Sequence, residues 1–130
     1  MRVITFGTYD VFHVGHLNLI KRARVLGDEL FVGVSSDRMN FEKKGRNPIY
    51  PERERMEIIA SLRDVDQVFL EESLALKRRY LTDYKADILV MGDDWAGKFD
   101  EFRDVCKVIY LPRTVGISTT DTIQKIRRYE

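Results

Sequence analysis

The sequence predicts an α/β fold, a doubly wound sheet of about five parallel strands with helices on both faces. Short apolar segments alternate along the chain with longer segments of helical periodicity. The apolar segments are nearly continuous, which is typical of strands buried on both faces of a parallel sheet. Strand–helix alternation then implies right-handed crossovers, giving a Rossmann-like arrangement. The chain has 130 residues and neither an internal repeat nor a linker, so we expect one domain spanning residues 1–130.

Five strands are expected, and each is followed by a turn or by a helical segment. Valine, isoleucine, leucine and phenylalanine dominate them, as expected for buried strands. The predicted strands cover residues 2–6, 29–35, 66–70, 87–92 and 107–112.

Four helices are predicted from apolar periodicity and capping residues. Gly27 is a candidate C-cap for the first, and Pro51 suits the first position of the second. Ser73 and Ser118 are candidate N-caps, the latter with Asp121 three residues on, as in a variant capping box. The charged "ERERME" segment of the second helix is expected to be a solvated face. The predicted helices cover residues 16–26, 51–64, 73–86 and 118–130.

Ligands of doubly wound sheets bind beyond the carboxyl ends of the strands. The loops to consider are therefore residues 7–15, 36–51, 71–73, 92–98 and 112–118. Residues 40–51 form the one long irregular connection expected, which in a compact domain is typical of a lid or binding loop.

Composition limits the classes of function. The net charge is +1, from 22 basic and 21 acidic residues, which argues against a protein that neutralises a nucleic-acid backbone. The single cysteine, Cys106, cannot form an internal disulfide. No segment resembles a signal peptide or a membrane span. We therefore expect a cytoplasmic protein with no nucleic-acid partner and no membrane insertion.

The loop "GTYDVFHVGH" (7–16) contains both histidines of the chain, His13 and His16. Gly15 allows a ligand to approach the backbone at the start of the next helix, where free N–H groups favour an anion such as a triphosphate. Alternatively, each histidine merely caps or packs. A zinc site is disfavoured because other ligands are too few, and a serine hydrolase because no G-x-S-x-G motif occurs.

A second helix start occurs in "LPRTVGISTT" (111–120). Arg113 follows the last strand, Gly116 permits a tight turn, and Ser118 opens the last helix. Taken alone, this pattern is an ordinary serine N-cap worth about 1 kcal/mol. Two such helix starts at one edge of a small sheet favour an anion-binding site.

Together, "GTYDVFHVGH", "MGDDWAGKFD" and "YLPRTVGISTT" resemble the glycerol-3-phosphate cytidylyltransferases, a branch of the His-x-Gly-His nucleotidyltransferase superfamily. The resemblance extends over nearly the whole chain. It implies transfer of CMP from CTP to sn-glycerol 3-phosphate, giving CDP-glycerol and pyrophosphate. It also implies Mg²⁺ carried by CTP, a homodimer, and a small phosphorylated alcohol as the second substrate.

The resemblance also implies roles for individual residues. The catalytic residues are His13, His16, Lys43 and Arg113, and the acceptor-binding residues are Lys43 and Lys77. The nucleotide-binding residues are Thr8, Tyr9, His13, Val14, Gly15, His16, Arg63, Arg113, Thr114, Val115, Gly116, Ile117, Ser118, Thr119 and Thr120.

Some assignments stay open. Asp93 is included among the nucleotide-binding candidates, yet Asp93 and Asp94 can equally bind Mg²⁺ or end a strand and cap a turn. Trp95 either stacks near a ligand or covers a loop. Leu74 and residues 45–48 depart from the family pattern near the acceptor. The alternatives are a related nucleotidyltransferase with another acceptor and a nucleotide-binding module without turnover.

Overall fold

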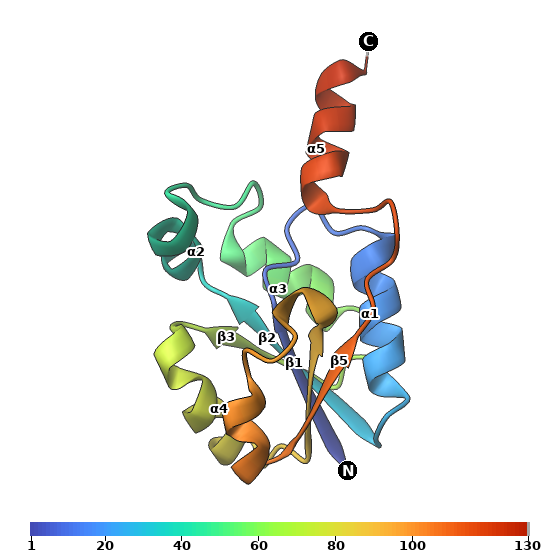
Figure 1. Ribbon diagram of the computed structural model, residues 1–130. Coiled ribbons are helices and arrows are strands. Elements are labelled where there is room, and N and C mark those ends of the chain that lie inside the picture. The colour runs from blue at the N-terminus through green and yellow to red at the C-terminus, as the bar shows by residue number, and fades with distance from the viewer. Residues whose placement is uncertain (130) are drawn as a thin grey trace.

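A computed structural model describes residues 1–129 and confirms the predicted fold class. All strand pairs are parallel, and the order across the sheet is β3-β2-β1-β4-β5 (Figure 1). The sheet is therefore doubly wound, with its switch point between β1 and β4. Every strand boundary lies within one residue of its predicted position. The strands are β1 (Arg2–Gly7), β2 (Glu29–Ser35), β3 (Gln67–Glu71), β4 (Ile88–Gly92) and β5 (Lys107–Leu111).

Helices cover both faces of the sheet, as the continuous apolar strands predict. One core cluster contains Ile20 of α1 and Ile59 of α3. The other contains Leu81 of α4 and Phe102 of η3. The helices are α1 (Val14–Arg24), α2 (Asp37–Lys44), α3 (Glu52–Ala60), α4 (Lys77–Asp83) and α5 (Thr119–Arg128), with 3₁₀ turns η1 (Leu74–Leu76), η2 (Asp93–Trp95) and η3 (Asp100–Asp104).

The prediction that residues 40–51 are irregular is wrong for their first part, because α2 extends to Lys44. The Met39 amide donates to Ser36 Oγ at the start of α2 (3.0 Å), and Gly45 ends it with a φ of 75°. Only Asn40 of α2 is buried. A short helix without an apolar stripe carries no periodic signal. The irregular connection is therefore residues 45–51.

Two further helix predictions need correction. The C-cap of α1 is Val25, whereas Gly27 lies so close to the N-terminus that a Cβ there would be 2.5 Å from the Met1 carbonyl oxygen. The predicted helix over residues 73–86 is divided into η1 and α4. Ser73 does act as a cap, but on η1, by accepting from the Ala75 amide.

The last helix, α5, projects away from the sheet (Figure 1), and none of its residues is buried. Its predicted N-cap is confirmed, since the Asp121 amide donates to Ser118 Oγ at 3.0 Å. No helix within residues 1–129 has the length and apolar character needed to cross a bilayer.

Candidate active site

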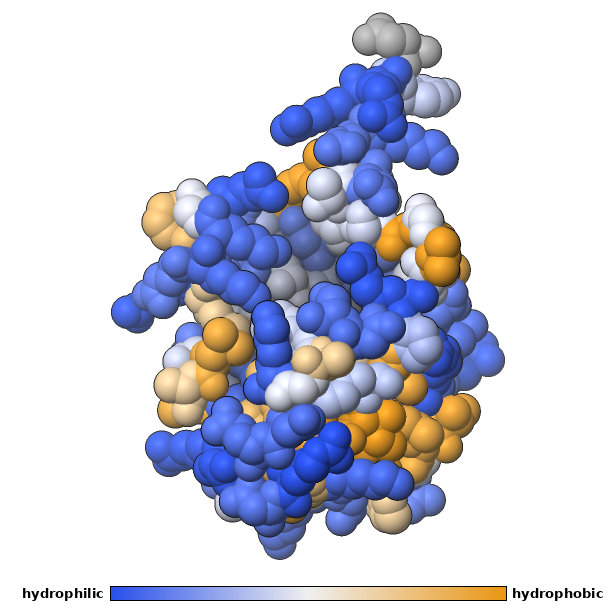
Figure 2. Space-filling model, in the orientation of Figure 1, coloured by the Kyte–Doolittle hydropathy of each residue, from blue (hydrophilic) through white to orange (hydrophobic). Residues whose placement is uncertain are grey.

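A cavity of about 730 Å³ opens at the carboxyl edge of the sheet, below α5 (Figure 2). The start of α1, the 45–51 loop, η2 and the start of α5 surround it. This is the switch point between β1 and β4, where the sequence predicts the ligand. The predicted site residues that line it are Thr8, Tyr9, His13, Gly15, His16, Arg113, Thr114, Ile117, Ser118, Thr119 and Thr120.

The two histidines cap α1 reciprocally. The Gly15 amide donates to His13 Nδ1 (3.0 Å), and the His13 amide donates to His16 Nδ1 (3.2 Å). The imidazole rings stack, with centroids 3.8 Å apart and planes 20° apart. The capping interpretation is therefore confirmed, but it does not exclude an anion site, because both rings also line the cavity.

The capping hydrogen bonds and the burial of the two rings determine the tautomer and the charge of both imidazoles. Each Nδ1 accepts a backbone hydrogen bond, so in each neutral ring Nε2 carries the proton. Burial and the nearby Arg113 lower the pKa of His13. Burial and the neighbouring His13 lower the pKa of His16 to about 4. At neutral pH both rings are uncharged Nε2–H donors, and the buried His13 Nε2 has no partner within residues 1–129.

The lowered pKa of His16 predicts how stability depends on pH. In the unfolded chain the pKa of His16 returns to its ordinary value of 6.5. Between pH 6.5 and about 4, His16 therefore binds a proton in the unfolded chain but not in the folded one, which lowers the free energy of unfolding. Stability from this group is fully present above pH 6.5 and is lost as pH falls toward 4. Urea unfolding at several pH values should show a steeper loss for the wild type than for His16→Asn. Parallel curves would contradict the assignment.

The second helix start is joined to the first by side-chain hydrogen bonds. Asn18 Nδ2 in α1 lies 3.2 Å from Thr114 Oγ1. Arg22 Nη1 donates to the Pro112 carbonyl at 2.8 Å. Gly116 has a φ of 80°, which explains the glycine between Arg113 and α5. Residues at the starts of α1 and α5 consequently line the same cavity.

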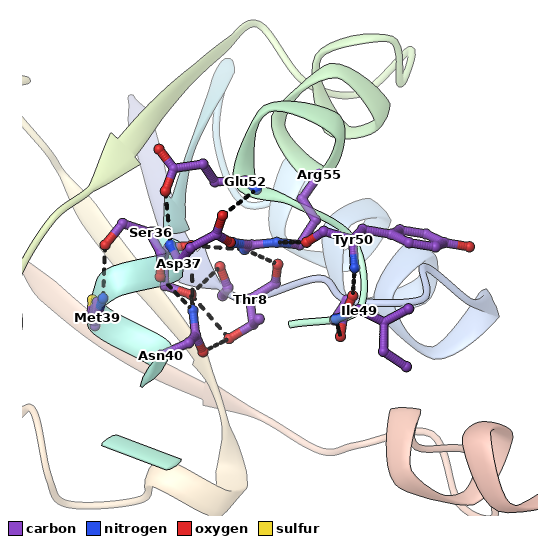
Figure 3. Close-up of polar contacts among 12 residues, drawn as sticks. Thr8, Ser36, Asp37, Met39, Asn40, Ile49, Tyr50, Glu52 and Arg55 are labelled. Carbon is purple, nitrogen blue, oxygen red and sulfur yellow. Dashed lines mark hydrogen bonds and ion pairs between the residues drawn. The ribbon is translucent and has the colours of Figure 1, made fainter. Parts of the chain in front are cut away.

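Arg55 supports the floor of this site, in contrast to the solvated position that its charged segment predicts. It was expected on a solvated face, but it is 0% exposed. Its Nη1 donates to the carbonyl oxygens of Thr8 (2.9 Å), which follows β1, and of Ser35 (2.7 Å), which ends β2 (Figure 3). The available signal was spacing, because Arg55 and the buried Ile59 lie one helical turn apart.

The same guanidinium joins the helices α2 and α3. Arg55 Nη2 pairs with Asp37 Oδ1 at 2.7 Å, and Nε donates to the Tyr50 carbonyl at 2.9 Å (Figure 3). The Asp37 amide donates to Glu52 Oε1 (2.8 Å), and the Glu52 amide donates to Asp37 Oδ2 (3.2 Å). Each helix start is thus capped by the first acidic residue of the other helix.

Asn40 is a cavity residue that sequence reasoning missed. Its Nδ2 donates to Ser35 Oγ and to the Ser36 carbonyl, both at 2.8 Å. Its Oδ1 accepts from Thr8 Oγ1 at 3.0 Å (Figure 3). This buried network holds the Thr8 side chain at the cavity wall.

Lys43 lies beside the cavity rather than in its lining. Its Nζ is 4.3 Å from the centroid of the Trp95 ring, and Trp95 does line the cavity. Partial burial and the neighbouring Lys44 lower the pKa of Lys43. Lys44 and Arg46, which the prediction omitted, line the cavity directly. The positive wall on this side is therefore broader than predicted.

Lys77 is not part of the cavity lining. It is 2% exposed, and its Nζ pairs with the buried Glu71 at 2.7 Å. The same ammonium lies 3.6 Å from the centroid of the Phe6 ring. Burial lowers the pKa of Lys77 and raises that of Glu71. Lys77 is therefore held in a buried ion pair away from the cavity lining, which its sequence context does not indicate.

The remaining predicted residues lie outside the main cavity. Asp93, Val115 and Gly116 line a neighbouring hollow that also includes Arg113. Val14, the first residue of α1, is exposed, as is Arg63. Arg63 precedes β3, at the edge of the sheet opposite the cavity. The structure does not bring Arg63 together with the histidines within this chain.

Comparison with known proteins yields consistent matches. A family model described as cytidylyltransferase-like matches residues 4–125. A glycerol-3-phosphate cytidylyltransferase from Bacillus subtilis is 44% identical over 125 residues, which are 96% of each chain. An FAD synthase from Thermococcus sibiricus is 39% identical over 136 residues, covering 97% of this chain and 92% of the other. The crystal structure of a lipopolysaccharide core biosynthesis protein from Thermoplasma volcanium superposes with a TM-score of 0.75 and 28% identity, covering 88% of this chain and 98% of that one.

Proposed function

Since this chain belongs to the cytidylyltransferase-like family, we propose that it transfers CMP from CTP to sn-glycerol 3-phosphate, forming CDP-glycerol and pyrophosphate. The name of the Bacillus subtilis relative supports this activity. The observation that carries the proposal is the pair of neutral Nε2–H donors at the start of α1, which share one cavity with the start of α5. Such a site suits the phosphates of a nucleotide.

The proposed chemistry needs positioning more than acid–base catalysis. A phosphate acceptor is already an anionic nucleophile at neutral pH, so neither a covalent intermediate nor a strong base is required. The acceptor oxygen attacks the α-phosphorus in line as the bond to the departing pyrophosphate breaks. His13 and His16 donate hydrogen bonds to the α- and β-phosphates, where negative charge develops.

Other residues bind the departing pyrophosphate and the acceptor phosphate. The amides at the start of α5 and the Arg113 guanidinium bind the departing pyrophosphate. Lys43, Lys44 and Arg46 neutralise the acceptor phosphate. Direct contact by Lys77 would require it to leave Glu71, which would then be buried without its partner.

The residues present fit a magnesium ion that arrives with CTP. No group of three His, Cys, Asp or Glu side chains suited to a metal occurs in the described part of the chain. Asp94 lines the cavity, and Mg²⁺ commonly uses one or two carboxylates together with substrate phosphates. When bound, the ion would neutralise phosphate charge. We also propose that the protein is a cytoplasmic homodimer. Sedimentation analysis of the purified protein would test the dimer, and cell fractionation would test the compartment.

Pyrophosphate release tests the proposed function. CTP, ATP, GTP and UTP are each incubated with glycerol 3-phosphate, phosphocholine or no acceptor. We expect CTP with glycerol 3-phosphate to be turned over fastest. Faster turnover with phosphocholine would contradict the proposal that glycerol 3-phosphate is the acceptor. The likeness to an FAD synthase supports a second candidate, adenylyl transfer from ATP to FMN, so this pair is included in the panel.

A further inference from the structure

We propose that Asp10 is a positioning residue that couples the 45–51 loop, on the acceptor side of the cavity, to the nucleotide side at the start of α5. The Asp10 carboxylate accepts hydrogen bonds from the amides of Ile49 (2.7 Å) and Tyr50 (2.8 Å). Its carbonyl accepts from Thr119 Oγ1 at 2.9 Å. One residue thus holds two segments that are far apart in the sequence. This inference rests on the proposed CTP site.

The charge of Asp10 serves this backbone connection and no ion pair. Asp10 is 9% exposed, and no basic side chain of residues 1–129 forms a salt bridge with it. Three amides compensate the carboxylate, the third being that of Val11 at 3.1 Å. Charge-assisted bonds to backbone amides are stronger than neutral ones. The carboxylate is therefore suited to holding the loop.

The backbone around Asp10 is strained, which indicates that its position matters. Tyr9 and Val11, on either side of it, have φ values of 56° and 47°. Such values are rare for residues with a Cβ, and especially for a β-branched valine. Strain of this kind persists only where the surroundings determine the conformation, and it is concentrated at functional sites. The bonds to Ile49, Tyr50 and Thr119 provide those constraints.

The hydrogen bonds of Asp10 couple nucleotide binding to the order of the 45–51 loop. Phosphates bound at the starts of α1 and α5 order the backbone around Asp10, and the ordered carboxylate then fixes the 45–51 loop. Lys44, Arg46 and Ile49 of this region line the cavity. A nucleotide that binds first thereby prepares the positive wall for the acceptor, and the second binding step has less ordering to accomplish.

Limited trypsin digestion of the full chain, with and without saturating CTP, tests the inference. In the wild type, CTP should slow cleavage after Lys44 and Arg46 about tenfold. In Asp10→Asn an amide would face the Ile49 or Tyr50 N–H, so protection should fall below twofold while the Kd for CTP, measured by calorimetry, changes less than threefold. If Asp10 served only the stability of the fold, its replacement would not reduce the protection from trypsin while leaving the Kd for CTP nearly unchanged.

Glu42→Gln is the matched control, because it removes an exposed carboxylate two residues before Lys44 that neither lines the cavity nor bonds to the 45–51 loop, and it should keep the tenfold protection. If Asp10→Asn fails to fold, Thr119→Val decides, since it removes the hydroxyl bond to Asp10. With its Kd for CTP measured alongside and CTP kept saturating, protection should fall below threefold. Full protection in a folded Asp10→Asn or, failing that, in Thr119→Val would overturn the coupling alone. Absence of CTP binding to the wild type would overturn the proposed function as well.

Discussion

Replacing His16 by asparagine is expected to lower turnover by about 10²–10³-fold or more while leaving the protein folded. The asparagine Oδ1 can take the place of Nδ1 and accept from the His13 amide, so the cap of α1 is kept. What is lost is the Nε2–H donor to the phosphates. The measurement is kcat and KM for CTP, with circular dichroism to verify the fold.

His16→Gln provides the complementary control. Its amide nitrogen reaches approximately the position of Nε2, so it restores a donor while losing the capping acceptor. We therefore expect at least tenfold more activity than in His16→Asn, together with a lower melting temperature. Near-wild-type turnover by folded His16→Asn would exclude the proposed role of the histidine pair.

Arg55→Ala is expected to lower the free energy of unfolding by about 3–5 kcal/mol, because it removes a fully buried cation that pairs with the partly buried Asp37 and serves several carbonyl acceptors. Asp37 loses its cation, and the carbonyl groups of Thr8, Ser35 and Tyr50 lose their shared donor. Buried acceptors without partners add to the cost. Urea unfolding at neutral pH measures the effect.

Arg53→Ala is the matched control on the same helix, where the arginine is exposed. Its effect should stay within about 0.5 kcal/mol, as is usual for surface substitutions. Arg55→Lys should lie between the two, since lysine keeps the charge but lacks the planar fork that reaches several acceptors at once. A loss below 1 kcal/mol in Arg55→Ala would show that the network around it contributes little.

The sequence by itself determined the features that depend on neighbours along the chain. Continuous apolar strands predicted the parallel sheet, and Ser118 predicted the start of α5. Because ligands bind at the carboxyl ends of parallel strands, the sequence also predicted that His13 and Arg113 share one site. These inferences succeed because hydrophobic periodicity and helix capping act over a few residues.

Tertiary structure decided what each charged side chain does. Arg55 and Lys77 both occur in segments rich in exposed charge, yet each is buried against a partner from another element, Asp37 and Glu71 respectively. The tautomers of the histidines likewise follow from capping geometry. A charged side chain is buried only where other segments supply an opposite charge or hydrogen-bond partners. Those partners come from elements distant in the sequence, and they come close only when the chain has folded.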